Sequence, residues 1–341
     1  MSLPKTYKAL QQKEKGKPFE MIDVEMKQPE KRQVVVKVLA CGVCRSDDLV
    51  KEEMMPVLPR IPGHEIIGDV VAVGDGVEAF EVGDRVGSGW HGSNCLACVQ
   101  CAKGDYPTCK NEGINGILTD GGYAEYVTLD FTGITKIPKE LDPAQAPLFC
   151  SGVTTFNSMR NMGLQPGAVV AIQGLGGLGH LGVQFAAKSG FKTVALSSSD
   201  SKKDLAKELG AHVYVDGSKE DQAEALNKLG GADLIMCTAP NADIIKKLIG
   251  GLAVNGTLLI LAVVGDDLQI PSMPLIQKRL SVRGWPSGSP RDSLEAIQFA
   301  LDQGIKCYVE KYPLEKAEEA YESMMSGKAR FRSVLIPNHQ A

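Results

Sequence analysis

The chain has 341 residues, enough for about two domains at the usual ~100–200 residues each. Its 37 basic and 41 acidic residues give a formal net charge of -4, so no basic field is available to hold a nucleic acid or an anionic membrane. The longest apolar run, residues 257–265, is far shorter than the ~20 residues of a membrane span, which leaves a small molecule as the expected partner.

Short β segments broken by glycine and turn residues fill residues 30–140. The runs QVVVKVLA, IIGDVVAVG, DRVGSG and YAEYVTL carry the β-branched and aromatic residues that strands prefer. They predict a compact, mostly β domain, for which we take residues 1–151.

Four of the nine cysteines gather in one stretch of this domain, SNCLACVQCAKGDYPTC. An odd number of cysteines in a chain without an apolar secretory leader argues against a disulfide framework, so we expect the reducing cytoplasm and metal or thiol chemistry. Four thiolates on one loop can close around a tetrahedral Zn²⁺ and leave no position for substrate, as in a structural site. An iron–sulfur cluster is the chemical alternative. The four are Cys95, Cys98, Cys101 and Cys109.

A second set of possible metal ligands is dispersed along the chain: Cys44 in CGVCRSD, His64 with Glu65 in PGHE, and Cys150 in PLFCSG. A catalytic zinc needs three protein ligands and one open position, and two cysteines with one histidine is a known ligand set. Taken singly, Cys150 also suits a buried apolar position and His64 a hydrogen-bonded loop histidine. The residues alone therefore leave this second site open.

From about residue 168, strands alternate with helices. The predicted strands are AVVAIQ, KTVALS, HVYVD, DLIMC and TLLILAV, and helices are expected over 178–189 and up to Gly210. Such alternation predicts right-handed βαβ units, and a doubly wound parallel sheet of about six strands fits residues 152–286. The predicted fold class is therefore α/β, joined to the mostly β domain.

A glycine-rich loop follows the first strand of the α/β region. Gly174, Gly176 and Gly179 form the pattern G-x-G-x-x-G, with Gly177 and Leu178 between them. The first glycine allows the tight turn, the second lets the backbone approach a pyrophosphate, and the third lets helix and strand pack closely. The helix N-terminus adds free N–H groups for the phosphates. The motif alone is weak, but its place among βαβ units predicts a dinucleotide site.

The residues at the end of the second predicted α/β strand, KTVALS, indicate which dinucleotide binds. An acidic residue is expected ~20 residues past the glycines when the ribose carries a free 2′-hydroxyl. This chain has VALSSSDSKK there, and small hydroxyls with two ammonium groups suit the 2′-phosphate of NADP. Asp200 leaves NAD open as the alternative, because it suits either a helix cap or a ribose. The predicted NADP contacts are Ser197, Ser198, Ser199, Lys202 and Lys203.

The C-terminal segment, 287–341, contains a predicted helix from about Ser293 to Gln303 and a final strand, RSVLIP. We expect this segment to fold back onto residues 1–151 and complete that domain. The α/β domain, residues 152–286, then lies between the two parts.

These motifs carry a resemblance that covers nearly the whole chain. CGVCRSD, PGHE, the four-cysteine loop, CSGVTT and GLGGLG occur in this order at family-like separations, and together they are highly specific. The sequence resembles a zinc-dependent alcohol dehydrogenase of the medium-chain dehydrogenase/reductase superfamily. The resemblance implies a Rossmann domain and a GroES-like catalytic domain, with one catalytic and one structural zinc per chain.

The resemblance also implies an activity, the transfer of a hydride between NADP(H), or alternatively NAD(H), and an alcohol, aldehyde or ketone. It implies that Cys44, His64 and Cys150 hold the catalytic zinc, with Glu65 as an occasional ligand. Asp47 is implied to orient His64, which makes physical sense because a ligating imidazole needs its other nitrogen held.

For the proton, the resemblance implies that Ser46 hydrogen-bonds the substrate oxygen and passes its proton toward the cofactor ribose. Many relatives continue this relay through a histidine three residues further on, where this chain has Leu49. We therefore expect activity with an altered pH profile, the relay being completed by water or by the ribose.

The remaining contacts are also carried over from the resemblance. Arg332 is implied to meet the pyrophosphate, with a surface tail charge as its alternative. Thr154 is implied beside the nicotinamide, and the backbone of Ala262 and Val263 at its carboxamide. The candidate aromatic walls of the substrate pocket are Trp90 and Trp285, with a place in the apolar core as the alternative for either.

The chain resembles the shorter, microbial-type members of the family, which are commonly tetramers or dimers, so we expect a homo-oligomer. A non-catalytic dinucleotide-binding protein of the same fold is the alternative from another functional class. Retention of Glu65, Asp47 and Ser46 beside the three zinc ligands argues against it, because such a protein has no need of an open metal site.

Overall fold

The computed structural model describes residues 3–327 and 329–339, and the chain divides into two compact units. The first unit comprises Met1–Val153, Ser287–Gln298 and Lys306–Ala341, and the second comprises Thr154–Pro286 and Phe299–Ile305. The division falls within two helices, α3 (Ser151–Arg160) and α9 (Pro290–Gln303). Residues 299–305, inside the segment expected to complete the first domain, thus group with the second unit.

The first unit is mostly β. A seven-stranded sheet runs in the order β16-β17-β3-β4-β5-β9, with β8 also paired to β3, and β1-β2 and β6-β7 form two-stranded sheets. Its strands are β1 (Thr6–Gln11), β2 (Glu20–Glu25), β3 (Gln33–Val43), β4 (Glu65–Val73), β5 (Arg85–Ser88), β6 (His91–Ser93), β7 (Gly113–Ile114), β8 (Tyr126–Asp130), β9 (Ile134–Lys136), β16 (Val309–Pro313) and β17 (Arg332–Ile336). Its other α-helices are α1 (Asp48–Lys51), α2 (Val99–Ala102) and α10 (Ala317–Met325).

The central strand β3 explains how the two ends of the first unit are joined. Its valine-rich sequence is buried along most of its length, as β-branched residues between neighbouring strands should be. It pairs antiparallel with β4 on one side and with the C-terminal β17 on the other, where Leu335 lies opposite Cys41. The C-terminal strand is therefore part of the same sheet as β3 and β4, which come from the N-terminal part of the unit.

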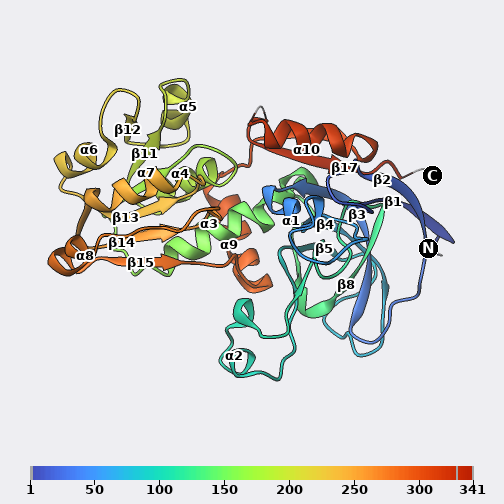
Figure 1. Cartoon of the computed structure of the whole chain (residues 1–341). Coiled ribbons are helices and arrows are strands. Elements are labelled where there is room, and N and C mark those ends of the chain that lie inside the picture. The colour runs from blue at the N-terminus through green and yellow to red at the C-terminus, as the bar shows by residue number, and fades with distance from the viewer. Residues whose placement is uncertain (1–2, 328, 340–341) are drawn as a thin grey trace. The chain divides into compact units, whose positions relative to one another are not determined.

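The second unit contains a parallel six-stranded sheet in the order β12-β11-β10-β13-β14-β15. The strands are β10 (Val169–Gln173), β11 (Lys192–Ser197), β12 (Val213–Asp216), β13 (Ala232–Cys237), β14 (Leu252–Ile260) and β15 (Ser281–Gly284). The helices are α4 (Gly179–Lys188), α5 (Lys203–Glu208), α6 (Gln222–Lys228), α7 (Ala242–Leu248) and α8 (Ser272–Lys278), and Figure 1 shows them flanking the strands. The order reverses at β10, the topological switch point where doubly wound sheets bind dinucleotides.

Each unit has its own apolar core. Aliphatic and aromatic side chains of β3, β4 and β8 form one, and the buried faces of β10, β11, β13 and β14 form the other. Among the described residues, no helix is both long and apolar enough to cross a membrane.

Candidate active site and metal centres

The dispersed candidate ligands come together in the first unit. One ligand atom each from Cys44, His64, Glu65 and Cys150 lies within 4.8 Å of the others, and the Sγ atoms of Cys44 and Cys150 are 3.8 Å apart. Cys44 directly follows β3, and His64 directly precedes the neighbouring strand β4. Cys150 closes the 3-10 segment Pro143–Phe149. Pairing of β3 with β4 therefore juxtaposes residues that are far apart in the sequence.

Burial and missing hydrogen bonds mark this group as suited to a metal ion. His64 and Glu65 are fully buried, and Cys44 is 7% exposed. Within the described part of the chain, both ring nitrogens of His64 and Oε2 of Glu65 have no hydrogen-bond partner. A buried polar atom left without a partner costs about 1–3 kcal/mol, which coordination to a metal ion would remove. Sulfur and imidazole nitrogen are the donor types that zinc takes.

The electrostatics of the metal-free group favour a thiolate. The hydrogen bond with Cys150 holds the pKa of Cys44 well below its ordinary value against the effect of burial, and His64 lowers it further. Burial lowers the pKa of His64, but Cys44 and Asp47 outweigh it, so that this pKa lies well above its ordinary value. A thiolate is the form of cysteine that binds metals. The negative charge of Cys44 and Asp47 therefore favours a positive charge at His64, which the imidazolium carries here and a bound metal ion would supply in its place.

Asp47 lies where it can orient His64. It is fully buried on the short 3-10 turn Arg45–Asp47 that also carries Ser46, and its Oδ1 is 3.3 Å from Nδ1 of His64. This is an ion-pair distance without good hydrogen-bond geometry. Its other oxygen, Oδ2, accepts hydrogen bonds from the Tyr123 hydroxyl at 2.8 Å and from the Cys44 N–H at 2.9 Å. The carboxylate is therefore fixed from two sides.

Arg332 enters the site from the C-terminal strand β17. It is 5% exposed and forms a buried ion pair with Oε1 of Glu65, so it is not a surface tail charge. Burial raises the pKa of Glu65 to about 7, against the lowering effect of Arg332. The structure thus gives Arg332 a partner that the sequence did not indicate, and its contact with a pyrophosphate stays a prediction.

Apolar side chains lie beside His64. The Trp90 ring meets the His64 ring edge-on, with centroids 5.2 Å apart. Trp90 and Leu49 both pack on an apolar cluster formed by Val50, Ile114 and Ile117. The second predicted pocket residue, Trp285, belongs to the second unit and lies under the guanidinium of Arg283, 5.4 Å from its ring centroid. A pocket wall at Trp90 therefore has a structural basis within the first unit.

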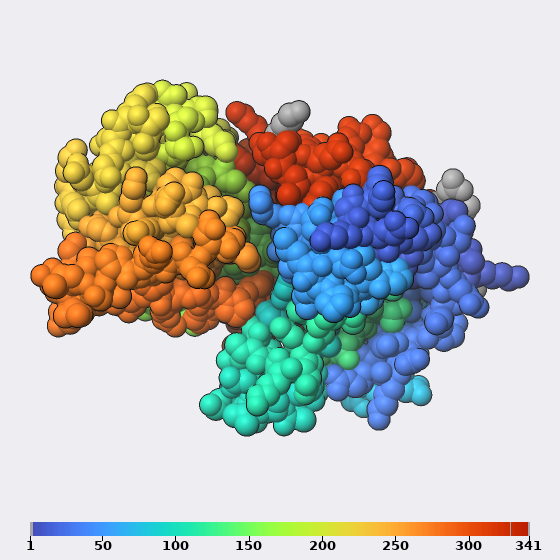
Figure 2. All heavy atoms as spheres, in the orientation of Figure 1, coloured from blue at the N-terminus to red at the C-terminus, as the bar shows by residue number. Residues whose placement is uncertain are grey.

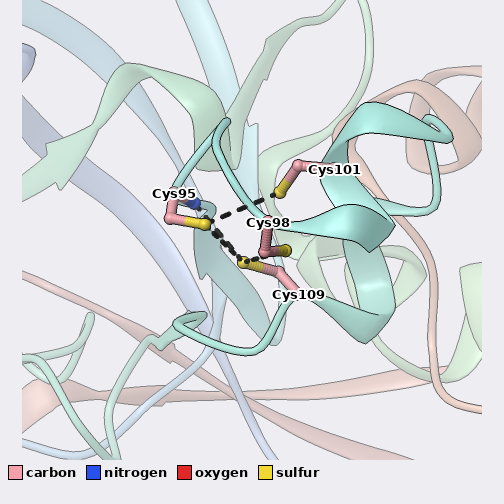
Figure 3. Close-up of side chains that lie close together, drawn as sticks. All are labelled: Cys95, Cys98, Cys101 and Cys109. Carbon is pink, nitrogen blue, oxygen red and sulfur yellow. Dashed lines mark hydrogen bonds between the residues drawn. The ribbon is translucent and has the colours of Figure 1, made fainter.

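The four clustered cysteines converge on one point, as Figure 3 shows. The Sγ–Sγ distances are 3.5 Å for Cys95–Cys109, 3.9 Å for Cys98–Cys109 and 4.0 Å for Cys95–Cys101. Four thiolates at the ~2.3 Å bond length of tetrahedral zinc lie ~3.8 Å apart, so the spacing fits a single ion. All nine cysteines are free thiols.

The backbone around this cluster supports thiolates at Cys95 and Cys98, whereas desolvation and the neighbouring thiols raise the pKa of Cys101 to about 12. Backbone N–H groups of Cys101 and Lys110 lower the pKa of Cys98 to about 6, and those of Ala97 and Cys98 lower the pKa of Cys95. The segment with helix α2 that carries the cluster extends away from the β-sheet of its unit, visible in teal in Figures 1 and 2. It has little apolar core of its own, so a metal ion is the natural means of holding it folded.

The glycine loop of the second unit connects β10 to α4. A Cβ added at Gly179 would lie 1.9 Å from the carbonyl oxygen of Gly174, so helix and strand approach too closely for any other residue. A Cβ at Gly176 would meet no described atom within 4 Å, which leaves open space over the loop. Gly177 and Leu178 lead directly into the helix N-terminus. The residues fit a pyrophosphate at this point.

The predicted 2′-phosphate contacts lie at the end of β11. Ser197 closes the strand, and Ser198 and Ser199 follow it before α5, which begins at Lys203. Nζ of Lys202 donates to the carbonyl of Leu175 in the glycine loop at 2.8 Å. Asp200, the residue that could instead bind the ribose of NAD, forms an ion pair with Lys219 at 2.5 Å, and both groups are exposed.

The remaining predicted cofactor contacts lie in the second unit. Thr154 is buried in the first turns of α3, and Ala262 and Val263 follow β14 in a loop where Val263 is 91% exposed. Their contacts with a nicotinamide stay predictions. The hydrogen bond from the Ala262 N–H to the carbonyl of Cys237 fixes this loop to the end of β13.

Sequence reasoning missed several residues that support these sites. Tyr123 holds Asp47, while Tyr214 and Gln222 hydrogen-bond the carbonyls of Ser199 and Ser197. Gly42 lies opposite Glu65 in the sheet, and a Cβ there would meet the Glu65 carboxylate at 1.8 Å. The glycine in CGVC could have indicated this close approach. No local sequence signal indicates the two tyrosines and the glutamine, because their partners lie far away in the sequence.

Comparison with known proteins extends these observations. The family model "Alcohol dehydrogenase GroES-like domain" matches residues 30–139, and "Zinc-binding dehydrogenase" matches residues 177–302. The alcohol dehydrogenase patD of Penicillium expansum is 47% identical over 334 residues, which cover 97% of this chain and 98% of that protein.

Solved structures are similar over the same length. A cinnamyl alcohol dehydrogenase from Sorghum bicolor has a TM-score of 0.88 at 28% identity, covering 97% of this chain and 98% of that one. A CAD from Helicobacter pylori, solved with NADP(H), has a TM-score of 0.85 at 25% identity with the same coverage. The GroES-like and Rossmann folds predicted from the sequence are confirmed. The chain belongs to the zinc-binding alcohol dehydrogenases of the medium-chain dehydrogenase/reductase superfamily and is an oxidoreductase of that family.

Proposed function

We propose that the chain is an NADP(H)-preferring alcohol dehydrogenase or carbonyl reductase that holds two zinc ions. The observation that carries this proposal is the donor set of Cys44, His64 and Cys150, in which His64 is fully buried and its imidazole nitrogens lack hydrogen-bond partners among the described residues. Three protein ligands leave the fourth position of a tetrahedral ion for substrate, which distinguishes this group from the closed four-thiolate group.

The proposed reaction balances as a hydride transfer. The carbonyl carbon of an aldehyde or ketone would gain a hydride, which bound NADPH would supply on becoming NADP⁺, and the carbonyl oxygen would gain a proton, which gives the alcohol. When bound, zinc supplies a Lewis acid for the substrate oxygen, and the nicotinamide carries the hydride. The same residues serve alcohol oxidation in reverse.

The chain's own residues hold the reacting groups and move the proton. Asp47 fixes the ring of His64, and the Glu65–Arg332 pair supplies a carboxylate beside the ligands. Ser46, on the turn directly after Cys44, exchanges the proton with the substrate oxygen. Trp90 and Leu49 keep one side of the site apolar and exclude water.

The preference for NADP(H) rests on the end of β11. Three serines and two lysines offer donors and positive charge to a 2′-phosphate, and Asp200 is already paired with Lys219. The NADP(H) bound to the Helicobacter pylori relative agrees with this preference. Tyr214 and Gln222 hold the serine segment in place through its carbonyl groups.

Replacing Ser197 with Asp should reverse the cofactor preference. The new carboxylate would repel the 2′-phosphate and accept a hydrogen bond from a 2′-hydroxyl. We expect the ratio of kcat/KM for NADPH to that for NADH to fall about 100-fold, because charged hydrogen bonds contribute ~1.5–3 kcal/mol. Steady-state rates with both cofactors over a panel of aldehydes and ketones measure this ratio.

Lys203→Ala should weaken the binding of NADPH but not that of NADH. The KM for NADPH should rise about 10-fold, because one charge-assisted contact of ~1.5 kcal/mol is lost. Lys207→Ala, an exposed lysine on the same helix α5, is the matched control. A wild-type preference for NADH, or equal effects of the two lysine variants on both cofactors, would contradict the NADP assignment.

Leu49→His should add a titrating group to the proton path. The half-buried Leu49 lies in the apolar cluster with Trp90, whose described members carry no side chain that titrates. Because a histidine titrates near pH ~6.5, the pH profile of carbonyl reduction should gain a limb that falls as the imidazolium deprotonates. Leu49→Gln, polar but not titrating, is the control. An unchanged profile in Leu49→His would count against this account of the relay.

A homo-oligomer and a cytoplasmic location complete the proposal, both drawn from the family resemblance and the reduced cysteines. A non-catalytic dinucleotide-binding protein is the competing function. It predicts cofactor binding with no turnover of any alcohol or carbonyl compound, so the substrate panel above separates the two.

A further inference from the structure

Tyr123 is a fully buried residue to which neither the sequence motifs nor the reaction assigns a role. Its hydroxyl donates to Oδ2 of Asp47 at 2.8 Å, and the Cys44 N–H donates to the same oxygen at 2.9 Å. Oδ2 therefore has two fixed donors. The other oxygen, Oδ1, is left facing Nδ1 of His64 at 3.3 Å.

The ring of Tyr123 is itself fixed by the segment that precedes His64. The Tyr123 N–H donates to the carbonyl of Pro62 at 3.0 Å. A Cβ at Gly63 would lie 2.4 Å from the ring, so the ring fills space that only glycine leaves free. Phe19 packs edge-on against the ring, with centroids 5.7 Å apart. Tyr123 thus contacts both the backbone leading to His64 and the carboxylate that faces its imidazole.

We propose that Tyr123 is a positioning residue for the catalytic metal, an inference that rests on the proposed function of the Cys44–His64–Cys150 group. Its hydroxyl fixes the rotation of the Asp47 carboxylate, so that Oδ1 stays with the imidazole and Nε2 stays directed at the metal. Without the hydroxyl, Asp47 keeps only one donor on Oδ2 and can turn. Mutation of a residue that holds a metal ligand in place typically lowers metal affinity or activity about 10–100-fold.

Tyr123→Phe tests this inference because it removes the hydroxyl and keeps the ring. The measurement is the release of zinc to a colorimetric chelator from the purified protein, followed over time together with kcat. We expect one zinc per chain to be released about 10-fold faster than in the wild type, with kcat reduced and KM little changed. The four-thiolate zinc is the internal control and should leave at its wild-type rate.

Tyr312→Phe is the matched control variant. It removes a hydrogen bond of the same kind, from the Tyr312 hydroxyl to Glu310 at 3.0 Å, on strand β16 of the same unit. This variant should release both zinc ions at the wild-type rates. Equal release by Tyr123→Phe and the wild type would overturn the inference.

Asp47→Asn separates positioning from general destabilisation. Because Tyr123 acts through Asp47, Asp47→Asn alone should reproduce the fast release, and adding Tyr123→Phe should change it little further. Fully additive effects would overturn the inference. If the wild type itself held no zinc outside the four-thiolate group, the proposed function would fail instead.

Discussion

Cys150→Ser is expected to abolish turnover while leaving the fold intact. A serine hydroxyl is a poor zinc ligand, so the group at Cys44 and His64 would lose its third donor. Lewis-acid stabilisation contributes several kcal/mol, so kcat/KM should fall by about 10³-fold or more. Zinc content should fall from two ions per chain to one, with a melting temperature close to that of the wild type, because Cys150 lies at the site rather than in the apolar core.

Cys307→Ser is the control for this experiment. Cys307 is a buried cysteine of the same unit, held through its backbone by the Gln145 side chain, and it is not one of the candidate ligands. It should keep both zinc ions and its turnover. Retention of wild-type turnover by Cys150→Ser would contradict the assigned ligand set.

Cys98→Ser is expected to act first on stability. Its thiol is one of four that converge in the segment around α2, and its removal opens the closed site. Structural zinc provides a large share of the folding free energy of such loops. We expect the free energy of unfolding to fall by about 3 kcal/mol or more, which lowers the melting temperature by at least ~4 °C.

Limited proteolysis, thermal melting and zinc content together check the Cys98→Ser result. Cleavage within residues 95–109 should become fast, and one zinc should be lost. The remaining folded protein should still reduce a simple aldehyde. Normal stability combined with a selective loss of turnover would overturn the structural role of the four-cysteine group.

The fold was largely predictable because the residue pattern of each unit indicates its strands and helices. Alternating strands and helices with a glycine loop predicted the six-stranded parallel sheet, and the strands of the first unit also follow their β-branched runs. The hairpin of β1 and β2 was not predicted. Its sequences, TYKALQ and EMIDVE, mix polar and apolar residues without strict alternation; Ala9 and Leu10 are buried in the core, and Tyr7, Ile22 and Val24 pack against it.

The candidate ligands and the supporting residue Asp47 were predictable, whereas the other supporting contacts were not, for one physical reason. Metal ligands are limited to a few residue types, so their spacing carries information even across the whole chain. Arg332 and Glu65, by contrast, pair across 267 positions, and Tyr123 reaches Asp47 across 76. Arginine and tyrosine occur throughout the sequence. The pairing of β3 with β17 brings Arg332 to the site, and the hydrogen bond from the Tyr123 N–H to the carbonyl of Pro62 holds Tyr123 there.

The most direct test of the account is zinc removal by a chelator with turnover recorded at each step. NADPH-dependent reduction of a simple aldehyde should decline in proportion to the loss of one zinc per chain, and should return when zinc is restored. The more slowly released four-thiolate zinc should follow with loss of stability. Undiminished turnover in a protein that has lost all its metal would contradict the zinc-dependent mechanism.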